Sequence, residues 1–89
     1  MRIPQKYQVF DEPVEVSDKD QERLSVHLVG WNRLNEILLL GSLNEPDLKR
    51  LVIIELAGSR RLDIVNRLLG RIAKLERKRI NSRIQKLVL

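Results

Sequence analysis

The last third of the chain constrains the fold most strongly, because residues 59–89 contain no proline and only one glycine, Gly70. Apolar residues recur there at steps of three and four, which predicts one long amphipathic helix over about residues 60–87. These apolar positions are Leu62, Val65, Leu69, Ile72, Ile80, Ile84 and Leu87. Gly58 marks a break before the helix, and Ser59 is a favourable N-cap. The rest of the chain is expected to be organised around this helix.

Positive charge is concentrated on the same segment. From residue 60 onward, ten lysines and arginines stand against two acids, a net charge of +8, whereas residues 1–59 carry seven against ten, a net charge of −3; together these give the total of +5. At about 100° per residue, five basic positions fall within roughly 60° of one another. These positions, here called the basic stripe, are Arg60, Arg67, Arg71, Lys74 and Lys78. Like charges at this spacing repel each other, so the stripe favours a polyanionic partner over a merely solvated surface.

Length and composition favour one all-helical domain. The 89 residues are rich in leucine, isoleucine and valine and contain only three aromatic side chains, a balance that suits helices packed on helices. The absence of cysteine excludes disulfides and thiolate metal sites. Neither a signal peptide nor a run of about 18 apolar residues is present, which predicts a cytoplasmic or otherwise intracellular protein with no membrane association.

Residues 1–16 are predicted to form an extended N-terminal arm that precedes a single helical domain, residues 17–89. Pro4 and Pro13 oppose a regular helix in the arm. A short alternation with a period of two runs through Tyr7, Val9, Val14 and Val16. Two interpretations remain open for this segment: the edge of a sheet, or a semi-ordered tail with a few docked side chains.

A first helix is predicted over about residues 18–40, with Ser17 as its N-cap and Gly41 just past its end. Its seam follows steps of four and three through Leu24, Leu28, Trp31, Asn35 and Leu38. Gly30 lies inside this pattern, so the segment is either two helices that meet at Gly30 or one helix with a close contact there. A strand over residues 24–29 is a third option.

A second helix is predicted over residues 46–57, because Asn44 and Pro46 form a typical helix start. The run that follows is apolar on more than one side, at Leu48, Leu51, Val52, Ile53, Ile54 and Leu56. Such a helix must be buried nearly all round, which in so short a chain predicts self-association. The residues expected to mediate it are Leu24, Leu28, Trp31, Leu38, Val52, Ile53 and Leu56.

Residues 50–69, RLVIIELAGSRRLDIVNRLL, resemble the helix-turn-helix pattern, with Gly58 at the tight turn. The resemblance implies that Ser59 touches the nucleic-acid backbone and that the start of the last helix enters the major groove. The side chains it would aim at bases and phosphates are Arg60, Arg61, Asp63 and Arg67. Ile54 departs from the pattern, which usually has a small residue there, and the last helix is unusually long. A plain αα-hairpin with a glycine turn is the alternative.

The residues indicate no catalytic, metal or cofactor site. His27 is the only histidine, and its neighbours in sequence supply no obvious orienting carboxylate. Asp18, Asp20 and Glu22 alternate like the start of a calcium loop, but the loop glycine and the distal glutamate are missing. Helix capping explains these acids better.

The expected function is therefore non-catalytic binding of nucleic acid by an oligomer. Duplex DNA is preferred and structured RNA comes second, because the chain lacks the aromatic platforms on which single strands stack. The predicted contact residues are Ser59, Arg60, Arg61, Arg67, Arg71, Lys74 and Lys78. An acidic protein surface is the other polyanion that the stripe could bind.

A structural subunit of a larger protein or nucleoprotein assembly is the rival interpretation, in which the helices make protein contacts. In broad plan, a small basic oligomer with a helix-turn-helix-like unit and a long hairpin is similar to the small subunits of viral DNA-packaging machines. That similarity implies an assembly role together with DNA binding, and a place within a viral particle.

Overall fold

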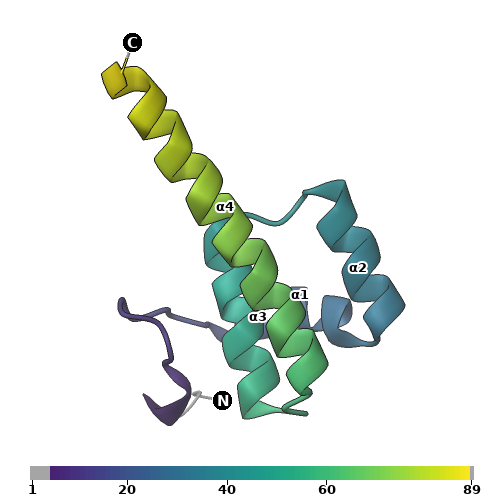
Figure 1. The fold of residues 1–89 in the computed structure, drawn as a ribbon. Coiled ribbons are helices and arrows are strands. Elements are labelled where there is room, and N and C mark those ends of the chain that lie inside the picture. The colour runs from purple at the N-terminus through teal and green to yellow at the C-terminus, as the bar shows by residue number, and fades with distance from the viewer. Residues whose placement is uncertain (1–4, 89) are drawn as a thin grey trace.

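The computed structural model of the chain describes residues 5–88, which are all-helical with no strand (Figure 1). The predicted fold class is confirmed. The elements in order are η1 (Gln5–Tyr7), α1 (Asp18–Ser25), η2 (Val26–Leu28), α2 (Trp31–Leu40), α3 (Glu45–Ala57) and α4 (Leu62–Val88).

The described part of the predicted arm is a tail with docked side chains. Its residues before Gln5 lie outside the described range. The side-chain amide of Gln8 donates to the carbonyl of Val14 (2.8 Å) and accepts from its N–H (2.9 Å), which closes a loop around Pro13. Phe10 packs on the core. The sheet-edge interpretation is wrong for these residues, because their backbone turns back on itself instead of running extended.

The predicted first helix is divided at Gly30. Ser17 caps α1 in a full capping box with Asp20, as the sequence predicts. After Ser25 the chain tightens into η2, and Gly30, with extended backbone, precedes the first turn of α2. This break buries Leu28 and turns α2 onto a new course, so the interpretations as one continuous helix and as a strand are both wrong.

Both predicted helix boundaries around residues 41–46 are confirmed. Gly41 ends α2 in the left-handed conformation (φ 68°) and donates its N–H to the carbonyl of Leu38. Asn44 caps α3 by accepting a hydrogen bond from the N–H of Asp47 at 2.9 Å, and Pro46 lies in the first turn.

Helix α3 is the centre of the molecule, with α1, α4 and the N-terminal arm packed around it. The fully buried residues on α3 are Leu48, Leu51, Val52 and Ile53. One chain therefore supplies the surroundings that its apolar pattern requires.

This burial corrects the predicted self-association residues. Five of them lie in the core of a single chain: Leu24, Leu28, Leu38, Val52 and Ile53. Leu56 is half-buried against the same core, and only Trp31 is exposed. The assumption that so short a chain could not enclose α3 is wrong, so the apolar pattern of α3 is not evidence for self-association, which stays a prediction.

The junction between α3 and α4 is a tight turn at Gly58. Its N–H donates to the carbonyls of Ile54 and Glu55, and Arg60 adopts a positive φ of 56° while its N–H donates to the Glu55 carbonyl at 2.8 Å. Helix α4 begins at Leu62, so the prediction that Ser59 is its N-cap is wrong. Figure 1 shows α3 and α4 side by side across this turn, an arrangement compatible with either an αα-hairpin or a helix-turn-helix unit.

The face of α4 that packs on the core agrees with the predicted one in part, since Val65 and Ile72 are buried as predicted. The buried residues are Ile64, Val65, Leu68 and Ile72, whereas Leu62 and Leu69 are exposed. Every residue from 77 to 88 is exposed, and Figure 1 shows this end of α4 projecting beyond the other helices. Within residues 5–88, none of the helices has the length and apolar content that a membrane crossing requires.

Candidate nucleic-acid interface

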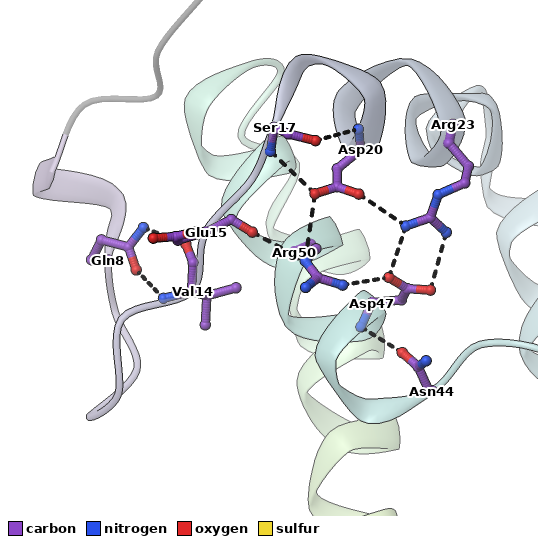
Figure 2. A network of polar contacts seen from close by, with 9 residues as sticks. All are labelled: Gln8, Val14, Glu15, Ser17, Asp20, Arg23, Asn44, Asp47 and Arg50. Atoms are coloured by element: carbon purple, nitrogen blue, oxygen red, sulfur yellow. Dashed lines mark hydrogen bonds and ion pairs between the residues drawn. The ribbon is translucent and has the colours of Figure 1, made fainter.

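Three arginines of the helical body, Arg23, Arg50 and Arg61, are paired with carboxylates. Figure 2 shows Asp47, at the start of α3, accepting two hydrogen bonds from Arg23 of α1 (3.0 and 3.1 Å) and one from Arg50 (2.8 Å). The hydrogen bond from Arg23 is the largest cause that holds the pKa of Asp47 below its ordinary value. Arg50 also donates to the carbonyl of Glu15 at 3.0 Å and so ties the arm to α3. These arginines stabilise the fold. Their positive charge is balanced by neighbouring carboxylates, so they are poor candidates for binding an anionic ligand.

Arg61, a predicted contact residue, is engaged inside the molecule. Its guanidinium donates to Glu55 at 2.8 and 3.2 Å, and its backbone N–H donates to the same carboxylate at 3.0 Å. A further hydrogen bond reaches the carbonyl of Leu28. Glu55 is only 2% exposed, whereas the Arg61 side chain is 36% exposed, so a buried carboxylate is paired with a half-buried guanidinium that fastens the turn to η2. The Arg61 guanidinium is therefore held by Glu55 and Leu28 and is not a free cation at the start of α4.

Arg60 and Ser59 lie in the turn and not on α4. The guanidinium of Arg60 donates to the hydroxyl of Tyr7 at 2.8 Å and lies 5.7 Å from the centre of the Tyr7 ring. Ser59 is exposed. Because residue 60 precedes the helix, Arg60 is not aligned with the rest of the basic stripe, and the stripe on α4 consists of Arg67, Arg71, Lys74 and Lys78.

The first two of these stripe residues flank α2. Arg67 is half-buried, and its Nε donates to the side-chain oxygen of Asn35 on α2 at 2.7 Å. Arg71 is also half-buried and approaches Gly41 at the end of α2. Neither guanidinium has a carboxylate partner among the described residues, so both keep their net charge.

Two ion pairs mark the point at which α4 leaves the body. Arg79 donates to Glu45 at 3.0 Å, and Lys49 lies 3.9 Å from Glu76. Lys74 and Lys78 are exposed beside them. Arg77, Arg83 and Lys86 are exposed too, although sequence reasoning missed them because they lie off the stripe. On a projecting helix every side faces solvent, so a basic residue there is accessible whether or not it belongs to the basic stripe.

The result is a separation of charge between body and projection. Helix α4 carries eight lysines and arginines against Asp63 and Glu76. Among the described residues, Arg79 is the only one of those eight that forms an ion pair within 4 Å. The seven others are Arg67, Arg71, Lys74, Arg77, Lys78, Arg83 and Lys86. They form the candidate interface, here called the α4 cation surface.

Groups suited to catalysis are not gathered in the part of the chain that the structure describes. No cluster of three or more histidine or carboxylate side chains able to hold a metal occurs within it. His27 lines an open hollow together with Arg33, Glu36, Ile37 and Leu40. Partial burial, and then the nearby charges of Arg33 and Arg23, lower the pKa of His27, which favours the neutral imidazole.

Comparison with protein-family models, with curated proteins and with solved structures finds no match for this chain. Its function is therefore inferred from its own geometry and charge.

Proposed function

We propose that the chain binds duplex nucleic acid, with DNA preferred, through the α4 cation surface. The observation that carries this proposal is the division of charge: Arg23, Arg50 and Arg61 are paired with Asp47 and Glu55, whereas among the described residues only one cation of α4, Arg79, has an acidic partner. Exposed cations held at fixed spacing on a rigid helix raise the local concentration of a polyanion and exchange its counterions.

The dimensions of the surface fit a run of phosphates. From Arg67 to Lys86 the helix rises about 28 Å at 1.5 Å per residue. A duplex carries one phosphate charge per roughly 1.7 Å of its axis, so several phosphates fall within reach of this length. We expect about five or six of them to be neutralised in the complex.

A duplex is favoured over a single strand by the side chains that α4 lacks. The helix contains no aromatic residue between Leu62 and Val88, so it offers no platform on which unpaired bases could stack. Phosphate contacts from lysine and arginine remain, and such contacts carry little sequence information.

The proposal assigns the contacts differently from a recognition helix. In that arrangement the start of α4 reads base edges, but Arg61 is held by Glu55 and Arg60 by Tyr7. The exposed cations lie further along α4, toward its projecting end. We therefore expect binding with weak sequence preference, governed by the number of phosphates contacted.

The proposal is tested by removing charge from the projecting end. The triple variant Lys74→Ala, Lys78→Ala and Lys86→Ala should weaken binding to a labelled duplex and reduce the slope of log affinity against log salt by about 3, since each lost phosphate contact removes close to one unit. All three residues are exposed, so the fold should persist. Lys19→Ala, at an exposed lysine of α1, is the matched control and should leave the slope unchanged. Equal slopes for the triple variant and wild type would contradict the proposal.

A second function, that of a subunit in a larger assembly, is supported by a separate observation. Helix α4 exposes large apolar side chains along its length, which a purely electrostatic interface does not need. The two functions are compatible, because these side chains and the basic stripe occupy different sides of α4.

A further inference from the structure

The exposed apolar side chains of α4 form one continuous face. At about 100° per residue, six exposed positions fall within roughly 60° of one another. This face, here called the outer apolar face, consists of Leu62, Leu69, Ala73, Ile80, Ile84 and Leu87. The large members are between 39% exposed, at Leu69, and 87% exposed, at Leu87. It is centred roughly 150° from the basic stripe, so a partner on one surface leaves the other free.

We propose that a second copy of this chain covers the outer apolar face, with the α4 helices of the two copies packed antiparallel. The spacing of the face is that of a coiled-coil seam. One set of positions a heptad apart holds Leu62, Leu69, Glu76 and Arg83, and the other holds Asn66, Ala73, Ile80 and Leu87. The two sets alternate at steps of four and three along α4.

The seam is self-complementary only when the helices run in opposite directions. If Leu69 faces Ile80 of the second copy, the same register places Leu62 opposite Leu87. The two charged positions of the seam are then opposite small or neutral residues: Glu76 faces Ala73, and Arg83 faces Asn66. Large apolar residues thus face each other at Leu62–Leu87 and Leu69–Ile80, and no two like charges are opposed, so a two-fold axis relates the two copies.

Parallel packing is opposed by charge. In that register Glu76 would face Glu76 and Arg83 would face Arg83 across the seam, where like charges repel. It would also set the cationic ends of both helices side by side. Antiparallel packing separates these ends and lays each projecting end along the first half of the other α4.

The shape of one chain leaves room for this partner. Leu62, Leu69 and Ala73 are exposed where α4 crosses the body, and the end of α4 that carries Ile80 and Leu87 projects past it. Figure 1 shows that projection. Each body would therefore lie beside the projecting end of its partner, and an apolar helix end that is bare in one chain would be covered.

The oligomeric state of the protein alone tests the inference. Light scattering after size exclusion, in high salt and without nucleic acid, should show a monomer–dimer equilibrium that moves toward dimer as the concentration rises. Ile80→Glu should weaken the dimer about tenfold or more, because two charged groups would enter the seam of each pair. Gln85→Glu makes the same addition of charge on an exposed residue near the opposite side of α4 and should leave the dimer intact. Far-UV circular dichroism should give all three proteins the same helix content.

Cross-linking tests the orientation. The chain contains no cysteine, so single substitutions give a clean readout. A mixture of Leu69→Cys and Ile80→Cys proteins should form a disulfide-linked heterodimer, and neither protein alone should cross-link efficiently. The proposal fails if the wild-type protein is monomeric at all concentrations, if Ile80→Glu dimerises as tightly as Gln85→Glu, or if Leu69→Cys cross-links mainly to itself. Loss of duplex binding in the triple variant described above would not affect these results, so the two proposals fail separately.

Discussion

The two arginines at the turn show how far individual residues can be interpreted from sequence. Arg60 and Arg61 were predicted to contact nucleic acid because they follow a turn glycine at the start of a basic helix. Their actual partners, Tyr7 and Glu55, are brought to them by the fold. Glu55 gave a signal that could have been used, since it is the only acid in an otherwise apolar run and therefore needs a cationic partner when it is buried.

The carboxylate of Asp47 predicts how stability depends on pH. Because hydrogen bonds from Arg23 and then Arg50 lower its pKa from an ordinary value of 3.8, the folded state binds fewer protons than the unfolded state. Its contribution is therefore present above about pH 4 and is lost as the pH falls through the folded-state pKa. Asp47→Asn should cost about 1–2 kcal/mol of unfolding free energy at neutral pH and less in acid. Urea unfolding at several pH values measures this, with Asp11→Asn in the exposed part of the arm as control. A cost that did not shrink in acid would contradict the ion-pair account.

At the scale of elements, the starts and ends of helices were predictable because they depend on a few neighbouring residues. Ser17, Gly41 and Asn44 act where the sequence placed them. The buried face of α4 was predictable only in part, because two sets of apolar positions overlap on that helix. Val65 and Ile72 were predicted and are buried, but only packing against α3 shows that Leu62 and Leu69 are left exposed.

Two glycines in helical segments should respond in opposite ways to alanine. Gly70 lies inside α4 with no atom within 4 Å of the position that a Cβ would take, so Gly70→Ala should raise the unfolding free energy by about 0.5–1 kcal/mol. Gly41 has a positive φ of 68°, so Gly41→Ala should lower it by about 1 kcal/mol. Denaturant midpoints of the two variants check both signs. A destabilising Gly70→Ala would mean that α4 is not continuous through residue 70.

At the scale of the whole molecule, the chain combines a compact body with a projecting rod. Its radius of gyration is 14.1 Å, against about 12 Å for a compact domain of this length, and its longest extent is 47 Å. In the body, Arg23, Arg50 and Arg61 form internal ion pairs, whereas most cations of the rod are exposed without one. The basic stripe and the outer apolar face lie on different sides of α4. The proposed binding of nucleic acid and the proposed pairing with a second copy would therefore use different surfaces of this helix.

The antiparallel pair and duplex binding should respond to salt in opposite directions. Each chain carries a net charge of +5, so screening should relieve repulsion between two copies. The same screening, together with the loss of counterion release, should weaken attachment to phosphates. Measurements across a salt series can therefore separate the two associations in one preparation.

The central claim is that α4 binds duplex through unpaired cations, and the salt dependence of that binding tests it most directly. Affinity for a labelled mixed-sequence duplex would be measured from roughly 50 to 200 mM salt. Neutralisation of five or six phosphates predicts a log–log slope near −5. Binding that is weak and almost independent of salt would contradict the account, and would assign the cations of α4 to an acidic protein surface instead.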